Sequence, residues 1–385
     1  MKKLLALLAV AGLIGAAQAQ QDPKTSVYGV MDVGIRHETH NTAADESATK
    51  VLSGNTFTSR FGILSEEDLG NGTKIKLKLE SGLTPTNGVS GNTGSTGTAL
   101  FDRAAWVGVA DSKLGEVQVG RNTLVTNDFA LSGVGDLIAA KGETAGQPAN
   151  TANSTYAVAP LRAAQVNAFA GNTSGVKNNR SDGLIKWTNT FGPVNVVLGY
   201  APGGQNGNNS KTSWTSGLNY AQGPLSAGIA NFTAIDAANK TLRATGTGAK
   251  YDIGAFTVQA ARWTQKSEAG YVAANLTTNG TYTGPVLGTA ATTGPSTDSS
   301  LNTVGVAYRV NPKLTTTLSA YRGEYTNGAG KAGRLNSSVF LTEYTLSKRT
   351  NLYGIVDYAK ASGDIASATV TRAVVGYTAG IKHSF

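Results

Sequence analysis

The chain has 385 residues, including 48 glycines and no cysteine. Glycine at about one residue in eight, without a collagen-like period, favours a turn-rich β protein, and the lack of cysteine excludes a small fold held together by disulfides. The formal net charge of +9 indicates anionic partners. Because the sequence also predicts export, we expect an anionic small solute or an anionic lipid surface as the partner, and no nucleic acid.

The first residues have the three parts of a secretory signal peptide. A pair of lysines is followed by an apolar run over residues 4–16 and by the cleavage-site sequence Ala-Gln-Ala at residues 17–19. The apolar run is shorter than the roughly 20 residues that a transmembrane helix needs, which disfavours an uncleaved anchor. We therefore expect residues 1–19 to be removed and residues 20–385 to form a single domain.

Beyond the signal peptide, the chain has no stretch of 18 or more apolar residues that would span a bilayer as a helix. Instead, a unit of about ten residues with alternating polar and apolar character recurs, which is the period of a β-strand. Sixteen strands are predicted, over residues 26–36, 60–67, 73–82, 101–110, 116–121, 182–188, 194–200, 212–220, 225–233, 241–251, 255–263, 301–310, 315–325, 335–346, 351–360 and 371–385.

The connections between these strands alternate in length. Every second one is a tight turn, such as residues 68–72 or 311–313, whereas the others are long and polar, the longest running over residues 122–178. This alternation is typical of an up-and-down barrel of the outer-membrane type. The predicted fold is therefore all-β, a 16-stranded antiparallel transmembrane β-barrel with short periplasmic turns and long external loops. The sheet must close, because an unpaired edge in lipid leaves backbone groups unsatisfied.

A soluble β-sandwich or a β-solenoid adhesin would also show alternating strands. Aromatic residues in or beside the predicted strands favour the barrel, because membrane barrels carry girdles of aromatic side chains at both interfaces. These aromatic residues are Tyr28, Trp106, Trp187, Tyr200, Trp214, Tyr220, Tyr308, Tyr321, Tyr344, Tyr353, Tyr358 and Tyr377.

The strand at residues 73–82 has three lysines that alternate with three aliphatic residues. A lysine that faces lipid at the middle of the bilayer costs about 2 to 4 kcal/mol, so these lysines are predicted to face the lumen, together with Glu80. The same alternation places a fourth lysine in the lumen. The predicted basic ladder consists of Lys74, Lys76, Lys78 and Lys186.

The sequence contains no catalytic or metal-binding motif. Its three histidines, His37, His40 and His383, lie in a predicted loop and near the end of the last strand, and neither HExxH nor GxSxG occurs. The glycine-rich residues 246–250 lack the spacing of a phosphate-binding loop and fall in a strand pattern. We therefore predict that the protein is not an enzyme and has no metal or other cofactor.

Five segments, in the right order along the mature chain, resemble the trimeric general porins of Neisseria, Bordetella and Burkholderia. They are SVYGVMDVGI at residues 26–35, SRFGILSEEDLGNGTKIKLKLESG at 59–82, RAAWVGVADSKLGEVQVGRNT at 103–123, LSKRTNLYGIVDYAK at 346–360 and GIKHSF at 380–385. The resemblance implies a homotrimeric porin in the outer membrane of a Gram-negative bacterium, a water-filled channel for passive diffusion of small hydrophilic solutes and ions.

The resemblance also implies the partners of the chain. They are outer-membrane lipid and lipopolysaccharide, small and preferably anionic solutes, and the barrel assembly machinery. The last strand resembles the C-terminal signal that this machinery reads, with Phe385 at its end and Tyr377 on the same face.

In the porins that the chain resembles, the third external loop folds into the pore, and its acids face arginines on the wall. Residues 122–178 would form this constriction loop, with Asp128, Asp136 and Glu143 as its acidic members, although the loop is longer and richer in Ala, Gly and Thr than in the family. The wall arginines implied by the motifs SRFG, FDRAAWVG, VGRNT and NNRSDG are Arg60, Arg103, Arg121 and Arg180.

This arrangement predicts an anion preference. Arginines on one wall and carboxylates on the loop would set up a transverse field, and the excess of cations would enrich anions by an attraction that salt weakens. Two other functions remain open from the sequence, a channel selective for organic anions or phosphate, and a plugged barrel that serves as a surface adhesin. The inward loop and the wall arginines favour a pore over the adhesin.

Overall fold

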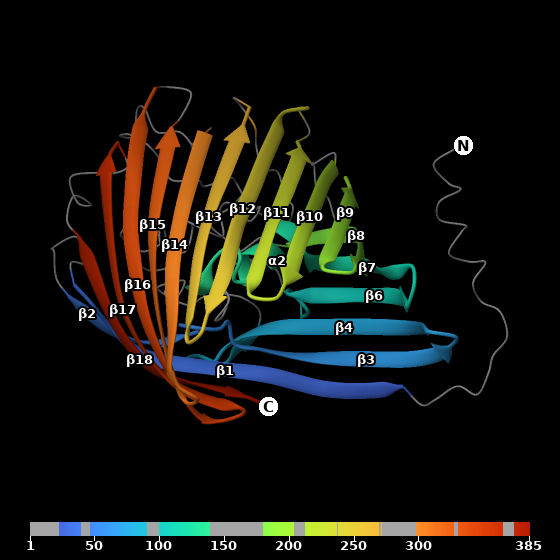
Figure 1. The fold of residues 1–385 in the computed structure, drawn as a ribbon, viewed down its shortest axis with the longest axis horizontal. Helices are drawn as coiled ribbons and strands as arrows, with labels where there is room; N and C mark the ends of the chain where they lie inside the picture. The colour runs from blue at the N-terminus through green and yellow to red at the C-terminus, as the bar shows by residue number, and fades with distance from the viewer. Residues whose placement is uncertain are drawn as a thin grey trace.

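The structure is a computed structural model that describes residues 23–39, 47–90, 100–138, 180–203, 212–236, 238–268, 271, 298–326, 330–364 and 373–385. The predicted signal peptide lies outside these residues. Most of the described chain is β-strand, and Figure 1 shows the strands curving round a short helix. Among the described residues, no helix is long and apolar enough to cross a membrane.

The elements have the following bounds. The strands are β1 (Lys24–Glu38), β2 (Ala48–Ser53), β3 (Arg60–Gly70), β4 (Thr73–Thr84), β5 (Val89–Ser90), β6 (Ala104–Asp111), β7 (Gly115–Thr123), β8 (Arg180–Phe191), β9 (Val194–Pro202), β10 (Thr212–Gln222), β11 (Leu225–Ile235), β12 (Thr241–Ile253), β13 (Phe256–Ser267), β14 (Asp298–Asn311), β15 (Leu314–Thr326), β16 (Ala332–Ser347), β17 (Thr350–Gly363) and β18 (Val374–Ser384), and the helix is α2 (Val125–Leu131).

Sixteen of these strands form the wall of a closed antiparallel barrel, which confirms the predicted fold class. Each wall strand pairs with the next, and β18 pairs back with β1 from Val30↔Ser384 to Glu38↔Gly376. The short strands β2 and β5 are additional, and they pair with the ends of β1 and β4. Closure of the sheet satisfies the backbone groups that an open edge would expose.

The seven tight turns predicted from the sequence join neighbouring wall strands at one end of the barrel. They connect β3 to β4, β6 to β7, β8 to β9, β10 to β11, β12 to β13, β14 to β15 and β16 to β17. In the first turn, Gly70, Asn71 and Gly72 have φ angles of 81°, 53° and 81°. Glycine adopts this left-handed backbone without steric cost, and asparagine tolerates it better than most residues. The long connections lie at the opposite end.

Residues 37–55, between the first two predicted strands, are partly strand. β1 continues to Glu38, and β2 pairs with it from Val33↔Ser53 to Glu38↔Ala48. The chain then makes a buried turn at residues 54–59 before β3 begins. A local sequence pattern could not indicate this turn, because the carboxylate that holds it, Asp32, belongs to β1.

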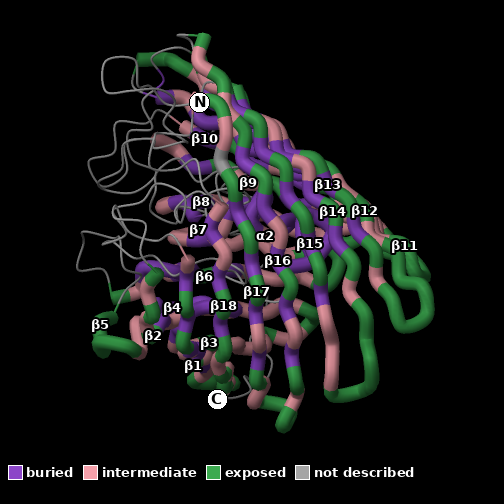
Figure 2. The backbone as a smooth tube through the Cα atoms, turned by 90° about the vertical axis from the view of Figure 1, so that its left-hand side faces the viewer, coloured by how far each residue is buried: buried purple, intermediate pink, exposed green. Residues whose placement is uncertain are grey.

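Alternate side chains of the wall point to opposite sides. Figure 2 shows this alternation as changes between buried and exposed positions along β12 to β17. Leu318 and Phe340 are exposed outward residues that pair across β15 and β16, whereas inward neighbours such as Leu341 are buried. The outward face of the wall is thus largely apolar, as the barrel prediction requires.

The prediction of aromatic girdles is wrong for four of the twelve aromatic residues. Tyr28, Tyr321 and Tyr353 donate hydrogen bonds to the carboxylates of Glu80, Asp136 and Asp32 inside the barrel, and Trp106 is an inward residue that pairs with Lys78. The alternation of the strand decides which side a residue faces. The aromatic type alone does not.

Candidate pore constriction

The helix α2 and the residues that follow it lie inside the barrel. α2 contacts β9, β10, β11 and β12, as Figure 1 shows. Phe129 of the helix packs against Trp263 of β13 with ring centroids 5.4 Å apart, and both residues are almost fully buried. The first described part of the predicted constriction loop is therefore anchored to the wall by an apolar contact.

Glycines on the inward face of the wall make room for this loop. A Cβ added at Gly217 of β10 would lie 2.6 Å from Cγ1 of Val125, and one added at Gly248 of β12 would lie 2.6 Å from the carbonyl oxygen of Val134. Real Cβ atoms essentially never approach other heavy atoms this closely. α2 and the turn after it can thus lie this close to the wall only because these two positions carry no side chain.

Hydrogen bonds fix the turn after α2 to the wall. The Gln259 amide on β13 donates to the carbonyl oxygens of Val134 and Gly135 at 3.1 and 3.2 Å. The Tyr321 hydroxyl on β15 donates to both carboxylate oxygens of Asp136 at 3.0 and 3.1 Å. The wall therefore holds the loop through both its backbone and a side chain, and the Asp136 carboxylate points toward β15.

The acids of the predicted constriction loop have different surroundings. Asp128 forms an ion pair with Lys186 of β8, whose ammonium also donates to the carbonyl oxygen of Thr123 at 3.1 Å. Asp136 is buried against Tyr321. Glu143 lies outside the described residues. The structure therefore joins Asp128 to a lysine of the predicted ladder and Asp136 to a tyrosine.

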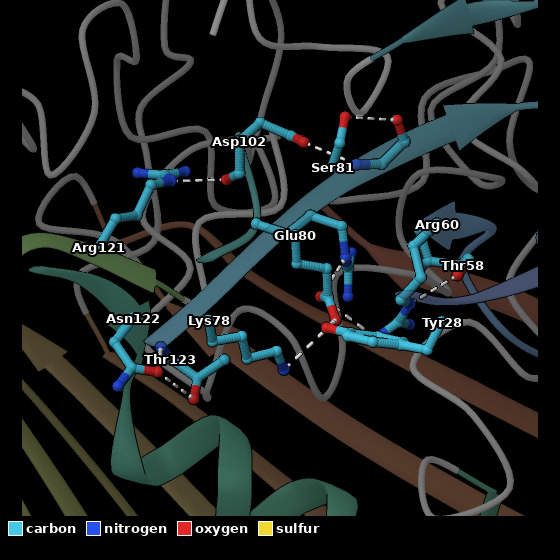
Figure 3. Close-up of polar contacts among 12 residues, drawn as sticks. Tyr28, Thr58, Arg60, Lys78, Glu80, Ser81, Asp102, Arg121, Asn122 and Thr123 are labelled. Carbon is cyan, nitrogen blue, oxygen red and sulfur yellow. Dashed lines mark hydrogen bonds and ion pairs between the residues drawn. The ribbon is translucent and has the colours of Figure 1, made fainter. Parts of the chain in front are cut away.

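Glu80 on β4 is the carboxylate that the wall cations share. Its Oε1 lies 2.8 Å from Nε of Arg103 and 3.6 Å from Nη1 of Arg60, and its Oε2 lies 3.3 Å from Nζ of Lys78 and 2.8 Å from the hydroxyl of Tyr28. Figure 3 shows the side chains of Tyr28, Arg60 and Lys78 around Glu80. Three cations thus surround one carboxylate, an arrangement that strengthens their hydrogen bonds.

Arg121 lies on β7 and Arg180 on β8, the two wall strands that follow β6. A β-bulge between Gly120 and Asn122 shifts the register of β7 against β8, and the Arg121 guanidinium pairs with the Asp182 carboxylate of β8. A bulge re-aims side chains in this way. Arg180 opposes Thr123 and is 3% exposed.

The lysines of β4 each face a carboxylate. Lys74 pairs with Glu66 of β3 at 2.6 Å and Lys76 with Glu116 of β7 at 2.7 Å, while Lys78 reaches Glu80. The three lysines occupy every second position of β4 and therefore lie on one face of the strand. The predicted basic ladder is therefore a row of ion pairs, and its positive charge is partly neutralised along its length.

The inward turn at residues 54–59 brings an aromatic ring to the arginine wall. Buried Asp32 accepts hydrogen bonds from the backbone amides of Thr56 and Phe57, both at 2.8 Å, and from the Tyr353 hydroxyl at 2.6 Å. The Arg60 guanidinium carbon lies 4.2 Å from the centre of the Phe57 ring, within cation–π range.

Sequence reasoning assigned no role in the site to Asp32, Phe57 or Asp182. Alternation places Asp182 on the same side of β8 as Lys186, but it does not indicate the ion pair of Asp182 with Arg121. No comparable signal exists for Asp32 and Phe57, because their contact is tertiary.

The last residue takes part in closing the barrel. The amide of Phe385 donates to the Gly29 carbonyl at 3.0 Å, and the amide of Gly29 donates to the Phe385 carbonyl at 3.1 Å. The Phe385 ring covers Gly29, where an added Cβ would come within 2.2 Å of it. Phe385 and Tyr377 both lie on the exposed outward face. That the barrel assembly machinery recognises these two residues stays a prediction.

Comparison with known proteins gives the following relatives. A family model described as Gram-negative porin matches residues 4–364. An outer membrane porin protein of Bordetella pertussis is 28% identical over 419 aligned residues, covering 100% of both chains. An anion-selective porin from Comamonas acidovorans has a similar fold, with a TM-score of 0.69 at 20% identity, covering 94% of this chain and 100% of that one. The trimer form of OmpT from Vibrio cholerae aligns with a TM-score of 0.62 at 11% identity, covering 95% and 100%.

Proposed function

The chain belongs to the Gram-negative porin family, and from this membership and the charges of its lumen we propose an anion-preferring pore. Small hydrophilic solutes would cross the outer membrane through the barrel by passive diffusion. The loop residues around α2 narrow one side of the lumen, and the arginine wall lies on the strands from β3 to β8. Charged rings and walls of this kind set ion preference in water-filled channels.

The observation that carries the proposal is the sharing of Glu80 by Arg60, Lys78 and Arg103. These four side chains together carry more positive than negative charge. Arginine retains its charge at any working pH, so the excess does not depend on titration. The name of the anion-selective Comamonas porin, which has the same fold, supports the same preference.

We also propose that the barrel assembles as a homotrimer in the outer membrane. The support is the trimer form of OmpT, an outer membrane protein of Vibrio cholerae with the same fold. Outward residues of β4, such as Ile75 and Leu77, are apolar and only partly exposed in a single chain, as suits a contact between subunits. Chemical cross-linking of the purified protein, followed by mass determination, tests the subunit number.

A channel selective for organic anions is a second candidate. The Phe57 ring beside Arg60, with the Lys382 ammonium 5.8 Å from the ring centre, offers apolar and cationic contacts at one place. A flat organic anion would use both. Block of chloride conductance by millimolar benzoate, but not by equal acetate, would favour this candidate over a general pore.

Planar-bilayer recording of the purified protein tests the pore. We expect stepwise conductance that rises with salt concentration, whereas a plugged barrel would give none. Replacing Arg60, Arg121 and Arg180 together by Ser should lower the preference for chloride over potassium. The matched control removes three cations from the tight turns by replacing Lys313, Lys348 and Arg349 with Ser, and should leave the preference nearly unchanged. Equal effects of the two triple variants would place the selectivity outside the proposed wall.

A further inference from the structure

The seam of the barrel is the place where its last strand, β18, meets its first strand, β1 (Figure 1). β18 pairs with β1 from Val30↔Ser384 to Glu38↔Gly376, and on its other side with β17. Every other pair of neighbouring wall strands is consecutive along the chain, so a turn or loop ties its two members together. The seam joins strands from the two ends of the chain, and its closure therefore costs more chain entropy than the closure of any other pair.

The inner face of β18 carries few side-chain atoms beside the seam. Alternation along the strand places Gly376, Thr378 and Gly380 on this inner face. Glycine has no side chain to pack, which weakens a strand interior. On the lumen side, β18 therefore depends on contacts made by the side chains of its two neighbours.

Arg36 of β1 crosses the inner face of β18 to reach β17. Its guanidinium donates to both carboxylate oxygens of Asp357 at 2.6 and 3.1 Å, and to the Thr378 hydroxyl of β18 at 3.0 Å. A Cβ added at Gly376 would overlap the guanidinium, so the path over β18 requires this glycine. The bidentate pair is of a strong and geometrically specific kind, and it joins two strands that do not pair with each other.

A second contact crosses β18 four residues further along. The Tyr353 hydroxyl of β17 donates to the Asp32 carboxylate of β1 at 2.6 Å. A Cβ added at Gly380 would overlap the Tyr353 hydroxyl, so this contact also passes directly over a glycine. The two contacts, Arg36–Asp357 and Asp32–Tyr353, are together called the seam clasp.

The four side chains of the seam clasp are buried, with exposed fractions between 0 and 5%. Removing one partner from a buried pair leaves an uncompensated charge or an unsatisfied donor. A slip of one residue in the pairing of a strand turns its inward side chains to the opposite face. The clasp can therefore form only when β1, β18 and β17 are all in their native register.

A contact of the same type lies on the other side of β1, away from the seam. Tyr28 of β1 passes over Gly62 of β3, where an added Cβ would lie 2.7 Å from its ring, and donates to Glu80 of β4 at 2.8 Å. There, the chain between β1 and β3 ties the two strands together. Tyr28 thus offers a control in which a similar contact is removed without affecting the seam.

We propose that the seam clasp locks β1 and β18 in their native register, and that the barrel opens first at this seam when the clasp is lost. The clasp acts as a strap, because two contacts from β1 to β17 hold down the glycine-containing strand between them. The proposal requires a closed barrel, but it does not depend on an open or anion-preferring pore.

Heat-induced unfolding of the purified, detergent-solubilised protein, followed on gels, tests the clasp. The clasp variant combines Asp357→Asn with Tyr353→Phe, and Tyr28→Phe is the control. We expect the clasp variant to unfold at a temperature lower by roughly 5 to 15 °C than the unmodified protein. An unchanged unfolding temperature would overturn the proposal.

Disulfides distinguish a defect of the seam from a general loss of stability. The chain has no cysteine, so Ile35→Cys with Ala379→Cys, two exposed and directly paired residues, can form a single disulfide across the seam. Phe340→Cys with Val356→Cys gives the matched disulfide between β16 and β17. The clasp substitutions should lower the unfolding temperature little in the oxidised seam background and fully in the other. The loss caused by Tyr28→Phe should be the same in both.

Equal losses from the clasp substitutions in the two disulfide backgrounds would overturn the proposal. If the clasp variant does not fold by itself, folding only with the seam disulfide supports the clasp, and failure to fold with either disulfide overturns it. Bilayer conductance measured on the same preparations keeps the two proposals apart, since a silent barrel with the expected dependence on the seam disulfide contradicts only the pore.

Discussion

Glu80 is the residue on which the electrostatics of the constriction depend most. It is 4% exposed and lies within ion-pair distance of Arg60, Lys78 and Arg103. Burying these cations without their carboxylate leaves uncompensated charge, which costs more than the pair itself contributes. The residue thus limits the positive excess of the lumen and also holds the wall together.

Replacing Glu80 by Gln should raise the preference for anions and lower the stability of the barrel. The loss of one partner from a buried ion pair costs about 3 to 5 kcal/mol, so heat-induced unfolding on gels should occur at a lower temperature. The control is Glu66→Gln, which removes the same charge from the more exposed pair with Lys74. A drop in anion preference for Glu80→Gln would contradict the proposed role of the cluster.

At the scale of elements, the seat of α2 depends on inward glycines. Replacing Gly217 by Leu would bring side-chain atoms against Val125, since even a Cβ would lie 2.6 Å from that residue. Overpacking costs about 1 to 3 kcal/mol, and we expect α2 to move toward the lumen and reduce single-channel conductance. Gly354→Ala in β17 is the control, because an added Cβ there meets nothing within 4 Å. Unchanged conductance of a folded Gly217→Leu barrel would mean that α2 does not narrow the pore.

The inward turn at residues 54–59 depends on Asp32. Replacing Asp32 by Ala should release the turn, because the amides of Thr56 and Phe57 and the Tyr353 hydroxyl lose their acceptor. Each buried donor left without a partner costs about 1 to 3 kcal/mol. We expect increased open-channel noise as Phe57 leaves Arg60. Thr56→Val removes only one hydroxyl donor to Asp32 and should give much quieter channels. Equal noise in both variants would speak against the turn as part of the pore.

Strands and tight turns could be predicted from the sequence because their causes are local. Alternation over residues 73–82 and the Gly-Asn-Gly turn before it need no information from the rest of the chain. The inward elements could not be predicted in the same way. α2 has seven residues and no side-chain cap at its N-terminus, so Phe129 and its contact with Trp263 decide its place. Likewise, the partners of Asp128 and Asp136 are set by distant strands.

For the whole molecule, the separation of charge between the two sides of the wall is the central feature. Among the described residues, the inner cations of β3 to β8 lie among carboxylates such as Glu80 and Asp182, and the outward cations of the strands lie on β12 to β17. Lipid forces the first group inward, and the second group lies on the outward face, away from the lumen. The positive charge of the chain is thus divided between the two sides of the wall, and only the charge on the inner side should affect ion flow.

The zero-current potential across a bilayer that separates two KCl concentrations tests this account most directly. The purified protein is inserted, the salt gradient is set, and the sign of the potential at zero current gives the preferred ion. We expect the sign of chloride selectivity, decreasing in magnitude as the salt concentration on both sides is raised, because screening weakens the wall charges. A potential with the sign of potassium selectivity would contradict the account.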